Sequence, residues 1–161
     1  NAIVWNAGDD AIDADQNWTG TLDNFLVMNP FDKCFELDGP EGAAATKNYV
    51  IKNGTVQAGR AAGLVDNDAK NTAADTNFDM ENVYFFDIKA GQSFDEMPKF
   101  YTANVKNLQV TLPDGTVIAD FFKDGSDAYT TSVERLKNTV GADLTKFSGW
   151  SWASVSKALE F

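Results

Sequence analysis

The sequence contains no histidine, and this absence restricts the chemistry that the chain can perform by itself. Histidine is the usual general base at neutral pH and the commonest metal ligand. Catalysis by a serine–histidine or cysteine–histidine pair is therefore excluded for this chain acting alone. There is one cysteine, Cys34, so no internal disulfide can form. Cys34 lies in an apolar stretch, which indicates a small core residue.

Basic residues are scarce as well. Lys and Arg together number 13 against 24 acidic residues, which gives a net charge of −11 and a pI of about 4.2. This balance argues against nucleic acids and anionic membranes as partners, because both require a basic patch. No apolar run approaches the length of a transmembrane helix, so we expect no direct membrane insertion of this segment. The acidic balance is compatible with cation binding.

An internal repeat organises the 161 residues. Its pattern is an apolar residue, any residue, Asn, any two residues, and an apolar residue. Ten or eleven residues past each Asn, a small residue is followed by an apolar one. The Asn positions are Asn1, Asn24, Asn53, Asn82 and Asn107, and the second set of pairs is Ala11-Ile12, Cys34-Phe35, Gly63-Leu64, Ser93-Phe94 and Val117-Ile118.

Each unit holds two or three short β-rich stretches separated by turn residues. We therefore predict an all-β fold, a right-handed parallel β-helix of about five coils with a C-terminal cap that contains a short helix. Asn tolerates the left-handed conformation of a bend, and stacked Asn side chains can hydrogen-bond to one another. The alternative is an antiparallel sandwich in which each Asn marks a hairpin turn, as Asn53-Gly54 would suggest.

The predicted domain organisation has two parts. Residues 1–123 would be stacked coils, the C-terminal part of a longer solenoid. Residues 124–161 would be the final strands and a cap, because a solenoid must cover its last coil. We expect a strand over Val117–Phe122, a short helix over Ser132–Lys137 and an aromatic covering from the last residues of the chain.

Three stretches carry a family resemblance: Ala7–Gly20, Phe35–Gly42 and Phe147–Trp152. They resemble the C-terminal regions of β-helical surface lipoproteins of Bacteroidota-type bacteria. The resemblance implies a place on the extracellular face of the bacterial outer membrane, or secretion. It brings no catalytic residues with it.

A second resemblance concerns Gly8-Asp9-Asp10, which looks like the paired-aspartate motif of polygalacturonase-type glycoside hydrolases. In those enzymes the two carboxylates act as acid and base. This sequence departs from the family because the histidine and the Arg-x-Lys motif are missing. A polysaccharide lyase would need a Lys or Arg base, and neither Arg60 nor Arg135 has a motif around it.

The repeat also aligns carboxylates, and it predicts that Asp13 lies beside Glu36 and Asp15 beside Asp38 in neighbouring units. Neighbouring parallel strands lie about 4.8 Å apart, so stacked carboxylates would repel unless they are exposed, protonated or bound to a cation. Calcium suits such oxygen clusters. The candidate metal ligands are Asp9, Asp10, Asp13, Asp15, Glu36 and Asp38; the alternative is a solvated acidic face.

For function we expect a non-catalytic cell-surface module that binds a glycan or an outer-membrane protein, with structural calcium as a possible cofactor. Trp5 and Trp18 are the candidate ligand-binding residues. The alternative is a polysaccharide-degrading enzyme, a lyase or glycoside hydrolase, with part of its active site upstream of this segment.

Overall fold

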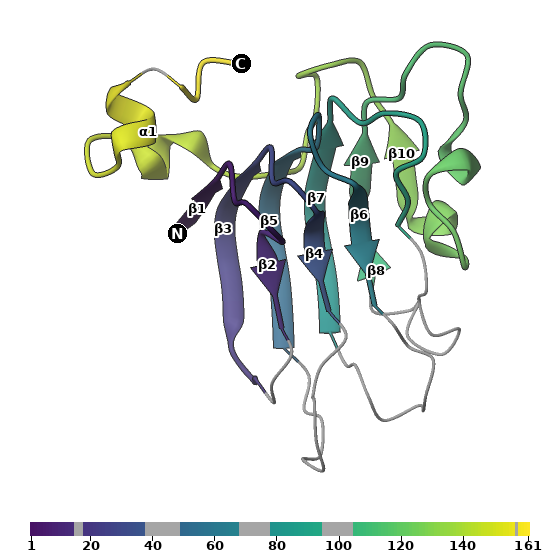
Figure 1. Cartoon of the computed structure of the whole chain (residues 1–161), viewed down its shortest axis with the longest axis horizontal. Coiled ribbons are helices and arrows are strands. Elements are labelled where there is room, and N and C mark those ends of the chain that lie inside the picture. The colour runs from purple at the N-terminus through teal and green to yellow at the C-terminus, as the bar shows by residue number, and fades with distance from the viewer. Residues whose placement is uncertain (15–17, 38–48, 68–77, 95–104, 157) are drawn as a thin grey trace.

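A computed structural model describes residues 1–14, 18–37, 49–67, 78–94, 105–156 and 158–161. Within these residues most of the regular structure is parallel β-sheet (Figure 1). The larger sheet has seven strands: β1 (Ala2–Trp5), β3 (Thr21–Met28), β5 (Tyr49–Gln57), β7 (Phe78–Phe86), β8 (Val105–Lys106), β9 (Leu108–Val110) and β10 (Thr130–Ser132). The smaller sheet has three strands: β2 (Ile12–Asp13), β4 (Lys33–Glu36) and β6 (Gly63–Asp66).

The repeat units pair in parallel, in the predicted register. Leu22 of β3 lies opposite Ile51 of β5, which lies opposite Met80 of β7, which lies opposite Val105 of β8. Every strand pair in both sheets is parallel, so the alternative of an antiparallel sandwich with hairpin turns is excluded.

The repeated Asn residues adopt the left-handed backbone conformation, as the sequence predicts. Their φ angles are 56° at Asn24, Asn53 and Asn82 and 57° at Asn107. A regular strand would place Leu22 and Phe25, three residues apart, on opposite faces. The left-handed residue between them lets both side chains face the same core, and this explains the spacing of the repeat.

The stacked side chains form a hydrogen-bonded row along the sheet, which we call the Asn ladder. Asn107 donates to Asn82 at 3.0 Å, Asn82 donates to Asn53 at 3.1 Å, and Asn24 donates to Asn1 at 2.7 Å. One step differs, because Asn53 donates to the carboxylate of Asp23 at 2.8 Å rather than to Asn24. The side chain of Asn24 is used elsewhere, as described below.

The predicted closure into a right-handed parallel β-helix is wrong. The strands form two separate sheets, and in the described part of the chain no further strands join them into a tube. The physical reason is that two facing sheets bury the apolar residues without a third wall. Phe25 and Phe85 of the larger sheet both pack edge-on against Phe35 of the smaller one.

The second set of repeat pairs is only partly in the predicted register. Ile12 lies opposite Phe35 as expected, but the partner of Phe35 is Val65 rather than Leu64. The next partners are Phe94 and Phe122, in isolated bridges. The reason is that Val65 lies one residue farther from Asn53 than Phe35 lies from Asn24. In the last unit, Ile118–Asp120 forms the 3₁₀ helix η2 in place of the expected strand.

Residues beyond the last strand also differ from expectation. No helix covers 132–137; the described helices nearby are η3 (Ser126–Tyr129), which precedes β10, and η4 (Leu144–Phe147) and the short helix α1 (Trp152–Val155), which follow it. No helix among the described residues has the length and apolar character needed to span a membrane. The division of the chain at residue 124 stays a prediction.

Residues 133–147, which we call the strap, run back across the outer face of the larger sheet. Backbone N–H groups of the strap donate to successive strands: Val133 to the carbonyl of Val110 in β9, Leu136 to the Tyr84 hydroxyl in β7, Ala142 to the Thr55 hydroxyl in β5 and Asp143 to the Asn24 amide in β3. At its end Phe147 is buried against Leu26 and Met28. The strap therefore connects the last strands to the first ones.

Candidate functional site

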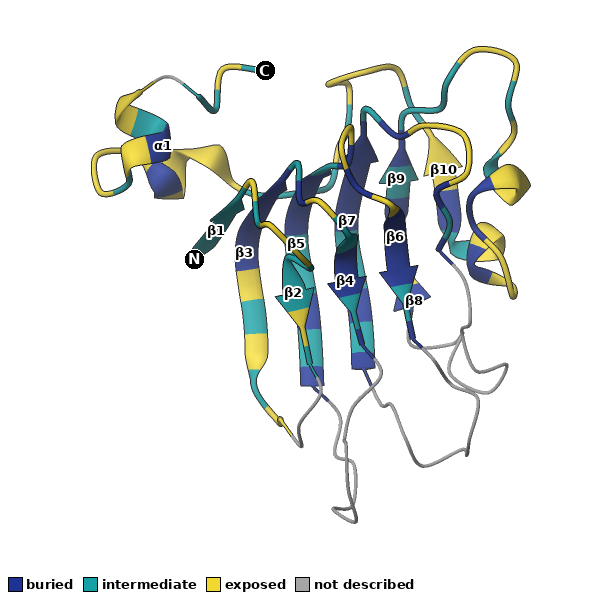
Figure 2. Cartoon of the chain, in the orientation of Figure 1, coloured by how far each residue is buried: buried dark blue, intermediate teal, exposed yellow. Residues whose placement is uncertain are grey.

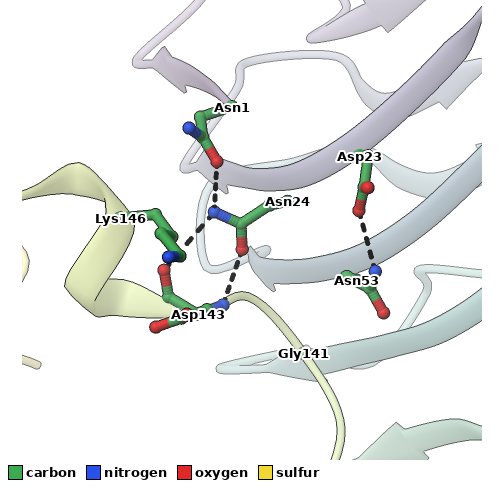
Figure 3. Close-up of a pocket in the computed structure, with 7 residues that line it drawn as sticks. All are labelled: Asn1, Asp23, Asn24, Asn53, Gly141, Asp143 and Lys146. Carbon is green, nitrogen blue, oxygen red and sulfur yellow. Dashed lines mark hydrogen bonds between the residues drawn. The ribbon is translucent and has the colours of Figure 1, made fainter.

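A polar pocket of about 470 Å³ lies where the strap meets the Asn ladder (Figure 3). Its lining combines the residue before β1 with residues from β3, β5 and the strap: Asn1, Asp23, Asn24, Asn53, Gly141, Asp143 and Lys146. Six of these seven carry amide, carboxylate or ammonium side chains. With such a lining the pocket is suited to a polar ligand, to which it can offer hydrogen bonds, rather than to an apolar ligand.

Asn24 holds the strap against the sheet at one side of this pocket. Its side-chain oxygen accepts the N–H of Asp143 at 2.6 Å, and its side-chain nitrogen donates to Asn1 at 2.7 Å and to the Asp143 carbonyl at 3.4 Å. Because these bonds join residues 119 positions apart, the pocket exists only in the folded chain.

Two carboxylates and one amine line the pocket. Asp23 accepts from Asn53 and lies 3.9 Å from the ammonium group of Lys52. Asp143 accepts from the N–H of Thr145 at 3.0 Å and from its hydroxyl at 2.6 Å. These bonds from Thr145 lower the pKa of Asp143 below its usual value. Lys146 is exposed.

An exposed aromatic residue is hydrogen-bonded to the backbone of Lys146, one of the residues that line the pocket. The indole N–H of Trp150 donates to the carbonyl of Lys146 at 2.7 Å, and its ring tilts against that of Phe147 with centroids 6.0 Å apart. Even so, Trp150 remains 56% exposed. The structure thus links an accessible aromatic ring to Lys146 of the pocket lining through one backbone hydrogen bond.

The acidic residues proposed as metal ligands form two groups. Asp9 and Asp10 cluster with Asp32. One carboxylate oxygen from each of the three residues lies within 4.8 Å of the other two. Asp32 was not predicted, although it and Asp9 both lie eight residues past a ladder Asn, which is the signal that could have revealed it. The trio could hold a cation through its oxygens.

Protein groups already neutralise part of this trio. One oxygen of Asp10 accepts the backbone N–H of Lys33 at 2.7 Å, and the Lys33 ammonium lies 3.2 Å from Asp32. Burial lowers the pKa of Lys33, but the hydrogen bonds and charges of Asp32 and Asp66 outweigh it and raise the pKa above its usual value. Asp10 therefore has a structural role whether or not a cation binds.

The second acidic group lies on the smaller sheet. Asp13 is opposite Glu36 as predicted, and Glu36 is opposite Asp66, which sequence reasoning missed. The ammonium of Lys33 also lies 3.4 Å from Asp66, so the same lysine partly neutralises both acidic groups. Asp15 and Asp38 lie outside the described residues.

The two tryptophans predicted to bind a ligand are packed against the protein. Trp5 is half-buried and meets Trp152 edge-on, with centroids 5.4 Å apart. Trp18 tilts against Tyr49 at 5.3 Å and also covers Gly20, although it remains 41% exposed. Neither lines the pocket beside the ladder.

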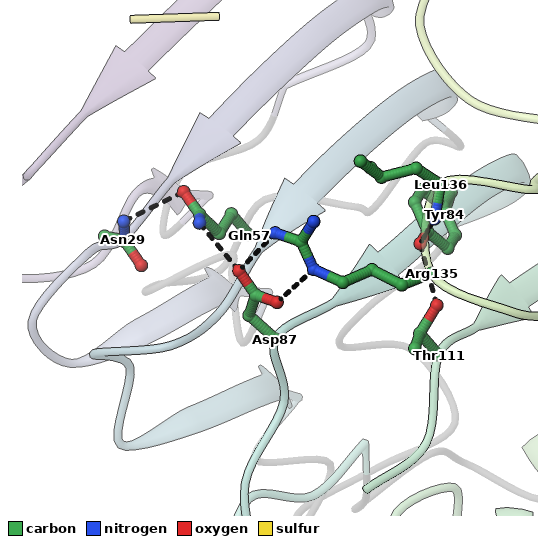
Figure 4. Close-up of polar contacts among 7 residues, drawn as sticks. All are labelled: Asn29, Gln57, Tyr84, Asp87, Thr111, Arg135 and Leu136. Atoms are coloured by element: carbon green, nitrogen blue, oxygen red, sulfur yellow. Dashed lines mark hydrogen bonds and ion pairs between the residues drawn. The ribbon is translucent and has the colours of Figure 1, made fainter. Parts of the chain in front are cut away.

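Two further side chains of the described residues, Cys34 and Arg135, serve the fold. Burial raises the pKa of the Cys34 thiol, with a contribution from Asp10, so that the thiol stays protonated. Arg135 forms an ion pair with Asp87 (Figure 4).

Comparisons with protein-family models, curated proteins and solved structures found no match for this chain.

Proposed function

We propose that this chain is a non-catalytic binding module that takes a neutral glycan in the pocket between the strap and the Asn ladder. The observation that carries the proposal is the pocket lining, in which amide and carboxylate groups of Asn1 and of two strands, β3 and β5, meet Asp143 and Lys146 of the strap. Sugar hydroxyls both donate and accept hydrogen bonds, and such a set of groups satisfies both.

Trp150 supports the same ligand class. Its exposed ring is hydrogen-bonded to the backbone of Lys146, a lining residue, and an exposed indole can cover the apolar C–H face of a sugar ring. A neutral glycan is favoured over one that carries carboxylates, since Asp23 and Asp143 line the pocket and the chain has a net charge of −11.

A binding role is favoured over catalysis because the chain lacks histidine and because Asp10 of the Gly8-Asp9-Asp10 motif is bonded to the backbone of Lys33. The family resemblance of the sequence extends the proposal to a location on the bacterial cell surface. An outer-membrane protein remains the alternative partner.

Binding to a panel of neutral and acidic polysaccharides would test this function by titration calorimetry. We expect Lys146→Ala and Trp150→Ala each to weaken binding of the responsive neutral glycan by about tenfold, equivalent to about 1.4 kcal/mol. The matched control is Lys137→Ala, an exposed strap lysine that does not line the pocket.

Two results would overturn the proposal. One is binding that Lys146→Ala and Trp150→Ala leave unchanged. The other is release of reducing ends or of unsaturated product from any substrate, which would instead support the polysaccharide-degrading alternative.

We propose further that the trio Asp9, Asp10 and Asp32 binds calcium as a structural ion. The supporting observation is the approach of three carboxylates in a chain of high negative charge. Calcium should raise the melting temperature of the wild type and of Asp114→Asn, a turn residue outside the trio, but not of Asp32→Asn. If calcium leaves the wild type unchanged, the trio is an ordinary acidic surface.

A further inference from the structure

The Asn ladder continues along the larger sheet beyond the polar pocket. Asn24 and Asn53 line the pocket, whereas Asn82 and Asn107 lie outside its lining. The hydrogen bonds from Asn107 to Asn82 and from Asn82 to Asn53 keep these three side chains in one row. Neighbouring strands of a sheet are about 4.8 Å apart, so the row presents one amide at each such step.

The amides of this row keep hydrogen-bonding capacity of their own. An Asn side chain has two N–H donors and an oxygen with two lone pairs. In the described structure, Asn82 uses one donor toward Asn53 and one lone pair toward Asn107. Asn107, which is exposed, uses one donor. Each step of the row can therefore offer both a donor and an acceptor to a ligand that lies on it.

A row of alternating charges runs beside the ladder, one residue before each Asn. Lys52 of β5 lies between Asp23 of β3 and Glu81 of β7. Glu81 in turn lies opposite Lys106 of β8, whose ammonium group is 2.8 Å from it. With two charges of each sign, this row is neutral, although the chain has a net charge of −11. It suits an uncharged polar ligand better than a polyanion or a polycation.

The strap covers only one side of the ladder. Two residues after a ladder Asn, Leu26, Thr55 and Tyr84 are at most 4% exposed. One residue before a ladder Asn, the side chains of Asp23 and Lys106 are 50% and 64% exposed. Figure 2 shows this change along β3, from yellow and teal at its start to dark blue at its end. The ladder from β5 onward and the charged row thus form an accessible surface, which we call the ladder strip.

We propose that the ladder strip binds an extended glycan of neutral β-1,4-linked hexoses, with one end of the glycan in the pocket and the following units over Asn82 and Asn107. This inference rests on the proposed glycan-binding function and specifies the chain geometry that the site accepts. One hexose unit of an extended glycan is close in length to the spacing of neighbouring strands, so successive units meet successive amides. A glycan with α-1,4 links coils, and it would leave a straight row after the pocket.

Lys106 and Asn107 are the residues that should determine the preference for long chains. Both are exposed and lie at the end of the ladder strip away from the pocket. Lys106 is paired with Glu81, but an ammonium group has three N–H donors, so further donors remain for sugar hydroxyls. A ligand that fills only the pocket does not reach either residue.

Titration calorimetry with β-1,4-linked gluco- and manno-oligosaccharides, from the disaccharide to the hexasaccharide, tests the proposal. The affinity for at least one of these series should rise about tenfold from the disaccharide to the hexasaccharide, whereas α-1,4-linked gluco-oligosaccharides should show no such rise. Asn107→Gly and Lys106→Gln should each remove most of the rise and leave the affinity for the disaccharide unchanged. Glycine is chosen because it keeps the left-handed backbone that Asn107 adopts, with φ of 57°.

Each variant has a matched control. Asn6→Gly makes the same change at an exposed Asn with φ of 49° that lies outside the ladder. Lys89→Gln makes the same change as Lys106→Gln at an exposed lysine after β7. Both controls should bind the hexasaccharide like the wild type. Thermal unfolding of each variant identifies any loss of fold, and if one of the two test variants unfolds, the other decides.

Three results would overturn the ladder strip as a binding surface: no binding of either β-linked hexasaccharide, equal affinity for the disaccharide and the hexasaccharide, or full hexasaccharide affinity in the folded variants. The pocket is judged separately by Lys146→Ala. If that variant weakens binding of a glycan whose affinity does not depend on chain length, the proposed function stands and the inference about the ladder strip fails.

Discussion

The guanidinium group of Arg135 contacts both carboxylate oxygens of Asp87, with Nε 2.8 Å from Oδ1 and Nη2 3.1 Å from Oδ2 (Figure 4). The same carboxylate accepts from Gln57, which in turn accepts from Asn29. Arg135 also lies over the ring of Phe86, 5.2 Å from its centroid. This one strap residue is thus tied to a hydrogen-bonded row that crosses several strands.

Removing this contact should loosen the start of the strap. Arg135→Ala is expected to lower the free energy of unfolding by about 1 kcal/mol, because a partly exposed bidentate pair and a cation–π contact are each worth roughly 0.5–1 kcal/mol. Arg135→Lys should recover only part of the loss, since lysine cannot make both bonds. Urea unfolding would measure the differences, and equal stabilities of all three proteins would contradict this role.

The contact also predicts a pH dependence. The hydrogen bonds from Arg135, followed by that from Gln57, hold the pKa of Asp87 below its usual value despite partial burial. A lowered pKa in the folded state stabilises the fold above the unfolded value of about 4, and this stabilisation disappears as the pH falls through the folded value. The stability difference between wild type and Asp87→Asn should therefore shrink in acid below pH of about 4, measured by urea unfolding.

The Asn ladder can be tested at Asn53, which has a φ of 56°, donates to Asp23 and accepts from Asn82. Asn53→Ala loses these bonds and places alanine, which tolerates the left-handed region less well than asparagine, at this φ, so we expect a loss of about 2–3 kcal/mol. Asn53→Gly keeps the backbone freedom and should lose less. If glycine is as costly as alanine in urea unfolding, backbone conformation is not the reason for Asn at this position.

Gly54 is required by its cross-strand partner. A Cβ atom at Gly54 would lie 1.9 Å from the tip of the Phe25 ring, which is fully buried. Gly54→Ala should cost about 1–3 kcal/mol through overpacking. The double variant Gly54→Ala, Phe25→Leu should lose less free energy of unfolding than the two single variants lose together. Strict additivity of the two losses would argue against this contact.

The Cys34 thiol should be inert in the folded protein. It is fully buried, and burial raises its pKa, so the reactive thiolate is suppressed. We expect negligible labelling by a thiol reagent under native conditions and complete labelling in denaturant. Fast labelling of a folded sample would show that the region around β4 opens.

Much of the fold could be predicted from the sequence, because the repeat expresses local conformation. An Asn that bends the strand, with apolar residues on either side, gives each unit the same backbone and the same inward face. Units with matching faces pair in register, and this pairing follows at Leu22, Ile51, Met80 and Val105. The proximity of Asp13 to Glu36 follows from the same periodicity.

What the repeat could not specify is how many sheets result and what covers them. The two facing sheets meet through contacts such as Phe25 with Phe35, and the predicted tube fails because these contacts bury the apolar faces without a third wall. The pairing of apolar residues also did not predict that Asp32 joins Asp9 and Asp10; only the equal spacing of Asp9 and Asp32 from a ladder Asn indicates it.

The sequence by itself therefore determined the repeating strands, their parallel register and their left-handed Asn bends, since these depend on residues close together in the chain or repeated at a regular interval. Only the tertiary structure decided the path of the strap and the pocket beneath it. The bonds of Asn24 to Asp143 and of Tyr84 to Leu136 join residues 119 and 52 positions apart. Each is a single contact between a strand side chain and an irregular backbone segment, so no periodic pattern in the sequence records it.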